Sequence, residues 1–231
     1  MNRPLGEILD WEPVASPACK VLAGHSVRLE PIDPARHGES LYAASHGPGI
    51  GPDLWDYLPV GPFGDLEEFT AYLERSARSD DPLFYSVVEE TSCKAVGVVS
   101  YLRIVPEQGV IEIGHIWFGP AVQRTPLSTE AIFLLMKHVF DDLGYRRLEW
   151  KCNALNEPSR RAALRFGFTF EGEFRQHMVV KGRNRDTAWF AMIDRDWPAI
   201  REAFERWIAP GNFDSQGKQR QSLAAIRASL R

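Results

Sequence analysis

The order of apolar and polar positions along the chain predicts a series of short strands. Apolar and polar residues alternate over residues 25–31, which is the pattern of a half-buried strand. Later stretches with strand composition are bounded by turn residues. The predicted strands are residues 25–31, 84–89, 94–104, 110–118, 147–152, 168–180 and 184–193. Gly97 and Gly114 lie inside two of them and indicate a bulge or a close backbone approach.

Apolar residues three and four positions apart predict helices between these strands. The longest begins at Pro126 and ends before Gly144, and its apolar face includes Leu134 and Leu135. Asp65 is the expected N-cap of an earlier helix. One helix is expected to begin at Pro34 and another after Asp65. Three more are expected over residues 126–143, 157–166 and 196–208.

The strand at 110–118, the helix at 126–143 and the strand at 147–152 form one unit. Because the connections are short, the two strands are expected to be parallel and joined by a right-handed crossover. The free N–H groups of the first helical turn would face the loop at 119–125 and form an anion site. The predicted fold class is therefore α/β, with a central twisted mixed β-sheet flanked by helices.

Composition narrows the class of protein. The chain has 231 residues, 44% of them hydrophobic and 25% charged, and these values are ordinary for a globular protein. A net charge of −4 gives no overall attraction for nucleic acid or an anionic membrane. Cys19, Cys93 and Cys152 form no CxxC pair and no cluster with zinc spacing, so we expect free thiols and no metal. With no signal peptide and no spanning segment expected, the predicted location is cytoplasmic.

Three motifs occur in order in the second half of the chain. They are Glu112-Ile113-Gly114-His115, then Gln123-Arg124-Thr125-Pro126-Leu127-Ser128-Thr129-Glu130-Ala131, then Asn156-Glu157-Pro158-Ser159 followed by Gly167-Phe168. Together they resemble the GNAT acyltransferase superfamily, specifically its Rim-type branch of ribosomal-protein N-acetyltransferases. The resemblance covers roughly residues 25–195. It implies the GNAT fold, acetyl-CoA as co-substrate and transfer of acetyl to a primary amine.

The second motif resembles the acetyl-CoA loop of the family, Q-G-x-G-I-A-T-E-A. Arg124 and Pro126 replace two family glycines, and Pro126 has no N–H to offer a phosphate. Proline is nevertheless favourable at a first helical position, and Arg124 can supply positive charge. The cofactor-binding residues implied by the resemblance are Phe118, Gln123, Arg124, Thr125, Leu127, Ser128, Thr129 and Asn156.

Acetyl transfer requires a group that removes the amine proton and a group that protonates the leaving thiolate. Glu112 is the expected base, and His115 is the alternative because its ordinary pKa lies near neutrality. Glu112 can instead be a salt-bridged strand residue, and His115 a structural one. The Rim-type branch points to Ser159 as the acid. Ser159 can equally belong to a helix start capped by Asn156, whose amide the resemblance places on the pantetheine arm.

The acceptor contacts are expected in two segments. Trp55 and Tyr57 lie in a loop rich in Gly and Pro, which by resemblance borders the acceptor cleft; otherwise they pack that loop down. His177 lies in the basic hairpin at residues 175–186. That hairpin either faces solvent or binds an acidic acceptor or the ribose phosphate of CoA.

The chain is expected to divide into an N-terminal arm at 1–24, a GNAT domain at 25–195 and a C-terminal helical extension at 196–231. The basic tail after Asp214 favours a loosely docked helix over an oligomer contact or a nucleic-acid contact. The expected partners are a small-molecule or peptide amine and a second copy in a homodimer, without membrane or nucleic acid. The competing interpretation is a GNAT-like module that binds acyl-CoA without turnover. The altered loop favours it, and so does Ala163, where many relatives have a tyrosine.

Overall fold

An eight-stranded sheet forms the centre of the computed structural model, which describes residues 3–230. The strands lie in the order β1-β2-β3-β4-β5-β6-β8-β7, and only β5 and β6 are parallel neighbours. The predicted parallel pair is therefore confirmed. The strands are β1 Leu22–Ala23, β2 Val27–Pro31, β3 Leu83–Glu89, β4 Ala95–Val105, β5 Val110–Phe118, β6 Arg147–Asn153, β7 Thr169–Val180 and β8 Arg183–Ile193.

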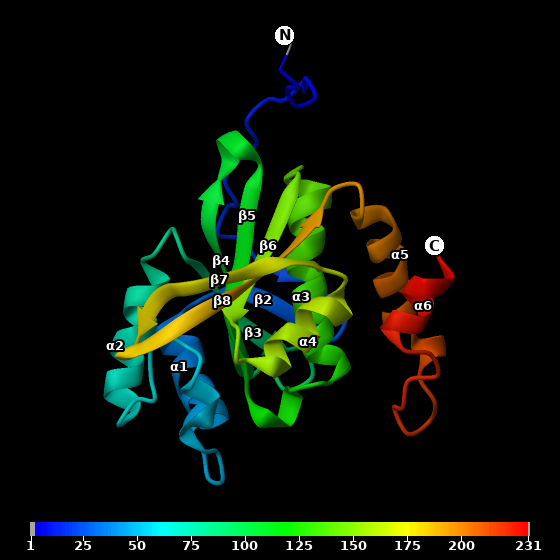
Figure 1. Ribbon diagram of the computed structural model, residues 1–231. Helices are drawn as coiled ribbons and strands as arrows, with labels where there is room; N and C mark the ends of the chain where they lie inside the picture. The colour runs from blue at the N-terminus through cyan, green and yellow to red at the C-terminus, as the bar shows by residue number, and fades with distance from the viewer. Residues whose placement is uncertain (1–2, 231) are drawn as a thin grey trace.

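Helices cover both faces of this sheet (Figure 1). One apolar cluster joins α3 and α5 to the sheet, and a second joins α1 and α2 to its other face. The helices are α1 Pro34–His46, α2 Leu66–Ala77, α3 Pro126–Lys137, α4 Glu157–Phe166, α5 Trp197–Ile208 and α6 Leu223–Ser229, with short 3-10 turns η1 Pro52–Trp55, η2 Pro106–Gln108, η3 Pro120–Val122 and η5 Pro210–Asn212. The fold class inferred from the sequence is confirmed.

Side-chain caps explain where several helices begin and end. The Asp65 carboxylate accepts the N–H of Glu68 at 2.8 Å, as expected for the N-cap of α2. Asn156 caps α4 by accepting the N–H of Ser159 at 3.2 Å. Gly167 ends that helix in the left-handed conformation, at φ 104°. The long predicted helix is interrupted: α3 stops at Lys137, and the π-helical turn η4 (His138–Asp142) follows it.

The two strand glycines mark special backbone positions. A Cβ on Gly97 would lie 2.5 Å from the Trp117 carbonyl oxygen, so this position requires glycine for a close approach. Gly114 directly precedes a bulge in β5, where the register against β4 shifts. Both glycines therefore match the interpretation drawn from the sequence.

The two ends of the chain contact the domain in different ways. Trp11 of the N-terminal arm donates to the Glu107 carbonyl at 2.9 Å and covers Gly109. At the other end, Leu223 and Ile226 of α6 are buried, and Arg227 donates to the carbonyls of Leu164 and Arg165 at the end of α4. The tail is therefore docked along α4 and α5, on the right in Figure 1.

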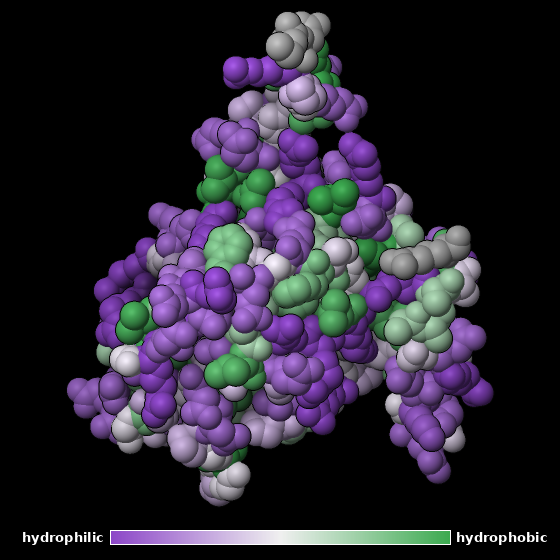
Figure 2. Space-filling model, in the orientation of Figure 1, coloured by the Kyte–Doolittle hydropathy of each residue, from purple (hydrophilic) through white to green (hydrophobic). Residues whose placement is uncertain are grey.

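Hydrophilic side chains dominate the face of the molecule shown in Figure 2, and its hydrophobic residues form small separate patches. None of the helices within residues 3–230 has the length and apolar composition needed to cross a bilayer.

Candidate active site

The two parallel strands pair over only half of their length. The register joins β5 to β6 from Val110↔Arg147 to Ile113↔Trp150. Beyond these pairs β5 continues along β4, while β6 continues along β8. The strands therefore diverge after Ile113 and Trp150 and leave an opening between them. Backbone N–H and C=O groups on the inner edges of this opening are available to a ligand.

A bulge lies at the start of this opening. Gly114 faces Ser100 and Trp117 faces Val98, so β5 has one residue more than β4 between these pairs. His115 occupies the extra position with φ 48°, in the left-handed region that a non-glycine residue rarely adopts. The shift changes the alternation of side chains along β5. His115 consequently packs edge-on against Phe84, on the side of the sheet covered by α1 and α2.

The opening is part of one large cleft with a volume of about 1250 Å³. Its walls come from β4, β5, β6, α3, α4, the tip of the β7–β8 hairpin, the loop at residues 53–59 and the C-terminal extension. The predicted site residues that line it are Tyr57, Glu112, His115, Phe118, Gln123, Arg124, Ser128, Thr129, Asn156 and Ser159.

Four predicted residues do not line the cleft with their side chains. Trp55 has 0% exposure and packs among His46, Phe63 and Trp117, so it holds the loop down and cannot touch an acceptor. Leu127 is buried in the core, and the Thr125 hydroxyl donates to the Val122 carbonyl. His177 bonds Thr187 at 3.0 Å and packs beside Phe174 and Trp189. Leu127 and Thr125 can therefore contact the cofactor only through their backbone.

The N-terminus of α3 lacks a side-chain cap. Thr125 is the N-cap residue, but its hydroxyl is directed to Val122. Within residues 3–230 the backbone N–H groups of Leu127 and Ser128 have no hydrogen-bond acceptor. Pro126, at the first helical position, has no N–H and fits there without strain. Two free donors and the positive end of the helix dipole thus face the cleft, which suits a diphosphate.

Positively charged side chains surround this helix end. Arg124 adopts φ 60°, in the left-handed region that favours glycine. Arg165 of α4 donates to the Thr129 hydroxyl at 3.1 Å and lies over the Trp207 ring, 5.0 Å from its centroid. Trp207 belongs to the C-terminal extension, which also lines this end of the cleft with Phe213.

Glu112 is buried and is held by two cations. Its Oε2 accepts from Arg103 at 2.6 Å and from Lys151 at 2.9 Å, whereas Oε1 has no hydrogen bond within the described residues. Lys151 is only 3% exposed; it also reaches Glu149 at 2.5 Å and lies 3.8 Å above the Trp189 ring. Glu149 in turn accepts from Arg147 at 2.7 Å. The expected salt-bridge role of Glu112 is therefore present, and one of its oxygens still points to no protein partner.

His115 is a neutral imidazole in this setting. Burial lowers the pKa of His115 below its ordinary value, and the charges of Arg103 and Arg185 lower it further. Its ring has no hydrogen bond to any of residues 3–230 and lines the cleft. A neutral, unpartnered imidazole can accept a proton from a ligand.

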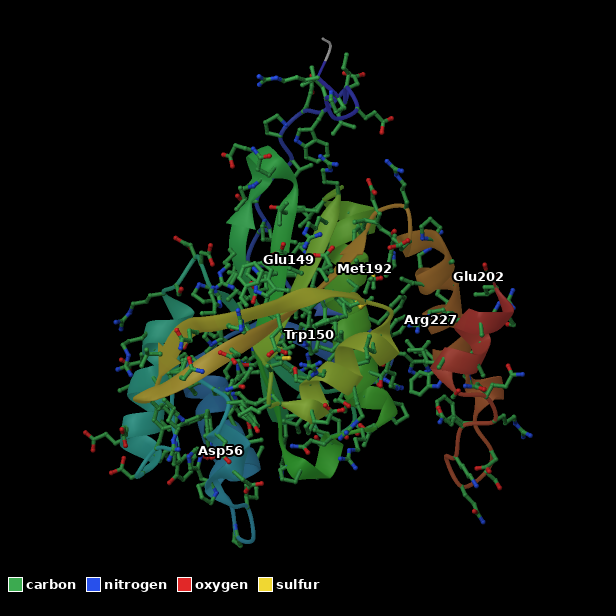
Figure 3. The ribbon with its side chains drawn as sticks, in the orientation of Figure 1. Asp56, Glu149, Trp150, Met192, Glu202 and Arg227 are labelled. Atoms are coloured by element: carbon green, nitrogen blue, oxygen red, sulfur yellow. The ribbon has the colours of Figure 1, made fainter. Side chains whose placement is uncertain are left out.

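Ser159 and its neighbours occupy the opposite side of the opening. The Ser159 hydroxyl accepts from the Trp150 indole N–H at 3.0 Å and also hydrogen-bonds the Cys152 thiol. Trp150 is labelled near the middle of the molecule in Figure 3, next to Glu149. Asn156 caps α4 through its Oδ1, which leaves its amide N–H₂ available to a ligand.

The wall opposite α4 consists of segments far apart in the sequence. The Tyr57 hydroxyl donates to the Leu155 carbonyl at 3.1 Å. Lys181, at the turn of the β7–β8 hairpin, donates to the Trp55 carbonyl at 2.8 Å. These two bonds join the loop at residues 53–59 to the turn between β6 and α4 and to the hairpin, and Figure 3 labels Asp56 within that loop.

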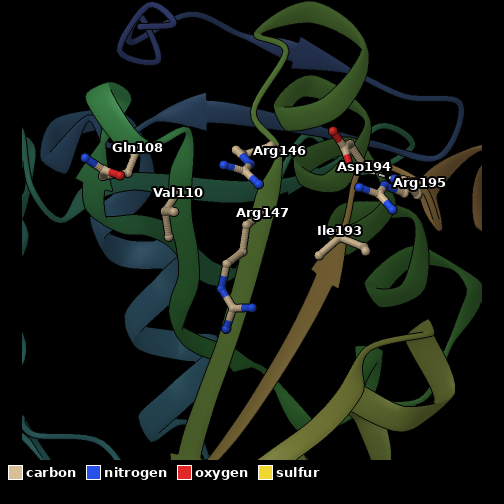
Figure 4. A pocket seen from close by; sticks show the side chains of 7 residues that line it. All are labelled: Gln108, Val110, Arg146, Arg147, Ile193, Asp194 and Arg195. Carbon is tan, nitrogen blue, oxygen red and sulfur yellow. Dashed lines mark hydrogen bonds between the residues drawn. The ribbon is translucent and has the colours of Figure 1, made fainter. Parts of the chain in front are cut away.

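A second cavity lies at the other end of the central strands. It has a volume of about 290 Å³ and is lined by Val110 at the start of β5 and Ile193 at the end of β8 (Figure 4). The Arg147 guanidinium drawn there is already paired with Glu149 and Glu171. The cavity is separated from the opening by the paired half of β5, so it contributes nothing to the large cleft.

Residues 27–169 match the family of the Acetyltransferase (GNAT) domain, which is more than half of the chain. The chain belongs to the GNAT acetyltransferases. It is an N-acetyltransferase that uses acetyl-CoA.

Named relatives agree with this assignment. "Uncharacterized N-acetyltransferase p20" of Bacillus licheniformis is 26% identical over 150 residues, covering 63% of this chain and 83% of that protein. "Ribosomal-protein-serine acetyltransferase" of Escherichia coli K12 is 32% identical over 98 residues, covering 42% of this chain and 54% of that protein. The similarity to the Rim-type branch is thereby confirmed.

A solved structure is similar over nearly the whole chain. The crystal structure of a GCN5-related N-acetyltransferase from Brucella melitensis has 50% sequence identity and a TM-score of 0.92, covering 95% of this chain and 99% of that one. Within residues 3–230 of the present enzyme, no group of three or more His, Cys, Asp and Glu side chains can hold a metal ion.

Several residues that line or border the cleft of this GNAT enzyme were not among those predicted from the sequence. Arg103, Lys151 and Arg185 line it, and Arg165 lies beside the end of α3. Arg185 belongs to the basic hairpin whose function was left open. In the sequence, Glu149 and Lys151 alternate with Leu148, Trp150 and Cys152, whose side chains are buried. The sequence does not show that Lys151 pairs with Glu112.

Proposed function

We propose that this enzyme transfers the acetyl group of acetyl-CoA directly to a primary amine, with both substrates bound in the cleft at once. One observation carries the proposal: the uncapped end of α3, the opening between β5 and β6, and the side chains of Glu112, His115 and Ser159 all border one continuous cleft. Acetyl-CoA supplies an acetyl group activated as a thioester.

Backbone groups and arginines would hold the cofactor. The N–H groups of Leu127 and Ser128 are free to bind the diphosphate, and Arg124 and Arg165 add positive charge beside them. The unpaired inner edge of β5 beyond Ile113 offers donors and acceptors to the amides of the pantetheine arm. The amide of Asn156 adds a further donor on the facing wall.

His115 is the proposed acceptor of the amine proton. General bases work best when their pKa lies near the working pH, and the lowered pKa of His115 keeps it neutral there. Glu112 would assist His115 in removing the amine proton. Its buried negative charge offsets Arg103 and Lys151, and its free Oε1 can accept a hydrogen bond from the amine or from a water molecule.

Ser159 is the proposed donor to the departing sulfur. Trp150 fixes the position of the Ser159 oxygen by donating to it, and the Ser159 proton, which lies within hydrogen-bond reach of the Cys152 thiol, would turn to the departing sulfur. Ala163, which aligns with the tyrosine found in many relatives, is fully buried and has no proton to give.

No cysteine is suited to carry the acetyl group. Cys152 lines the cleft but is buried, and burial raises the pKa of its thiol, which keeps it protonated. Cys19 and Cys93 are exposed but do not line the cleft. Direct attack by the amine therefore agrees with the distribution of thiols.

Mass spectrometry and thiol release test the proposal together. The enzyme is mixed with acetyl-CoA alone and then with a panel of amines that includes a peptide beginning with serine, because of the name of the Escherichia coli relative. We expect unmodified protein without amine, and one thiol released for each acetylated amine. An acetylated protein that passes its acetyl group to an amine would refute direct attack. Binding of acetyl-CoA without acetylation of any amine would favour the non-catalytic module.

A further inference from the structure

Arg185 is the one cationic side chain in the acceptor end of the cleft for which residues 3–230 provide no counter-ion. It lies on β8 and lines the cleft, yet it takes part in no salt bridge and no hydrogen bond within the described residues. Its Nε is buried without an acceptor. A buried donor without an acceptor is costly, and an acceptor on a bound ligand would remove that cost.

The surroundings of Arg185 increase this cost. Burial lowers the pKa of Arg185, and the nearby charge of Arg103 lowers it further. Glu112 is within electrostatic reach, but its Oε2 is already shared by Arg103 and Lys151. Three cations, Arg103, Lys151 and Arg185, thus share two carboxylates, Glu112 and the Glu149 that pairs with Lys151, so the local excess of charge is positive.

The hairpin fixes Arg185 over the opening. The last residue of β6 that pairs with β8 is Asn153, opposite Thr187, so Arg185 extends past the end of β6. A bulge in β7 lies beside it, where the register jumps from Phe174↔Thr187 to Met178↔Arg185. The hairpin turn is tied to the Trp55 carbonyl by Lys181 at 2.8 Å. The backbone that carries Arg185 is therefore held in place before any ligand binds, which lowers the cost of binding.

We infer that Arg185 binds an oxyanion, a carboxylate or a phosphate, on the amine acceptor itself. A guanidinium with a free edge matches such a group with two parallel hydrogen bonds. Asp53 and Asp56 line the same cleft and would favour the positive end of the same molecule before it loses its proton. The acceptor is accordingly an amine that also carries a negative group. This inference rests on the proposed function, because it names the class of acceptor.

Matched pairs of amines test the inference by turnover. Each pair differs in one anionic group: phenylalanine and phenethylamine for a carboxylate, phosphoethanolamine and ethanolamine for a phosphate, and Ser-Asp and Ser-Asn peptide amides for an acidic side chain. We expect kcat/KM about 10- to 100-fold higher for the anionic member of at least one pair. In Arg185→Gln this preference should fall close to one, and Arg185→Lys should retain part of it. The pair with the largest ratio identifies the source of the oxyanion.

Binding of the N-acetylated products gives a readout that does not need turnover. Calorimetry in the presence of CoA should show the anionic products binding to the wild type and about 10-fold or more weaker to Arg185→Gln, with CoA affinity unchanged. Equal binding of anionic and neutral products, or an equal loss of both in Arg185→Gln, would overturn the inference. If the products bind as expected while no amine is acetylated, the transferase proposal fails and the anion site stands.

Discussion

The two ends of the cleft are built in different ways. At the cofactor end, the groups proposed to hold the diphosphate come mainly from one stretch of sequence, the loop at residues 119–125 and the first turn of α3, with Arg165 of α4 beside them. At the acceptor end, Tyr57, Glu112, Lys151 and Arg185 come from four separate segments. The cofactor end relies on backbone N–H groups, and the acceptor end relies on side-chain charge.

This difference has a functional consequence. Backbone donors at a helix end suit a ligand that never changes, because no substitution other than proline removes them. Side-chain charges on a hairpin and a loop can change without disturbing the sheet. The comparison predicts that substitutions at the two ends should affect different kinetic constants.

The largest loss of kcat is expected for His115→Gln, at the acceptor end of the cleft. Loss of a general base typically lowers kcat by about 100- to 10,000-fold, while CoA affinity should stay unchanged. The wild-type kcat should fall as the pH decreases below about 6.5, because the lowered pKa of His115 places its protonation in the acid range. Steady-state kinetics between pH 5 and 9 measure this, and the acid limb should disappear in the variant. An unchanged acid limb in His115→Gln would assign the proton to another group, and Glu112→Gln would then be examined in the same way.

The next largest effect is expected at the cofactor end, for Ser128→Glu. A carboxylate at the start of α3 is favourable for the helix, by about 0.3–1 kcal/mol, yet it repels the diphosphate. We expect CoA to bind about 100-fold more weakly, which corresponds to ~2.7 kcal/mol, and thermal melting of the variant without CoA shows whether it remains folded. Ser128→Ala is the control, since it removes only the hydroxyl that bonds the Thr125 carbonyl. Unchanged CoA affinity in Ser128→Glu would mean that the diphosphate binds elsewhere.

The same contrast explains which parts of the molecule the sequence predicts. Local signals gave the Asn156 cap, the Gly167 end of α4 and the parallel strand pair, because these depend on residues near one another in the chain. The pairing of Glu112 with Arg103 and Lys151 depends on the register of three strands, and no periodicity encodes that.

The loop before α2 shows the same limit of sequence reasoning. Trp55 and Tyr57 have similar chemistry and lie two residues apart, yet one is fully buried and the other lines the cleft. The loop has no repeating pattern from which the direction of each side chain can be inferred. Only the packing of Trp55 against Trp117 and Phe63 separates the two.

A smaller effect is expected for Arg124, where backbone and charge can be separated. Arg124→Gly suits the left-handed backbone and removes the charge, whereas Arg124→Ala removes the charge alone. If charge is what this position contributes, both variants should bind CoA about 3- to 10-fold more weakly, and Arg124→Lys should bind normally. Titration at low and high salt provides the measurement, since screening should reduce the difference. Normal affinity in Arg124→Ala would show that the side chain takes no part in binding.

The smallest effect is expected for Tyr57→Phe, at the acceptor end. The variant removes the hydrogen bond between the Tyr57 hydroxyl and the Leu155 carbonyl, and a single bond of this kind contributes about 0.5–1.5 kcal/mol. Because the bond joins the loop to the turn that follows β6, its loss should raise the KM for the acceptor by about 2- to 5-fold and leave CoA affinity unchanged.

Tyr42→Phe is the matched control for this substitution. Tyr42 stacks on His46 in the aromatic cluster that contains Trp55, and its hydroxyl has no hydrogen bond within the described residues. Loss of this hydroxyl should change neither the KM for the acceptor nor the affinity for CoA. Initial rates at varied acceptor and saturating acetyl-CoA separate the two variants. A fall in CoA affinity for Tyr57→Phe would contradict the division of the cleft into two independent ends, because a change confined to one wall would then have been transmitted across β6 to the other.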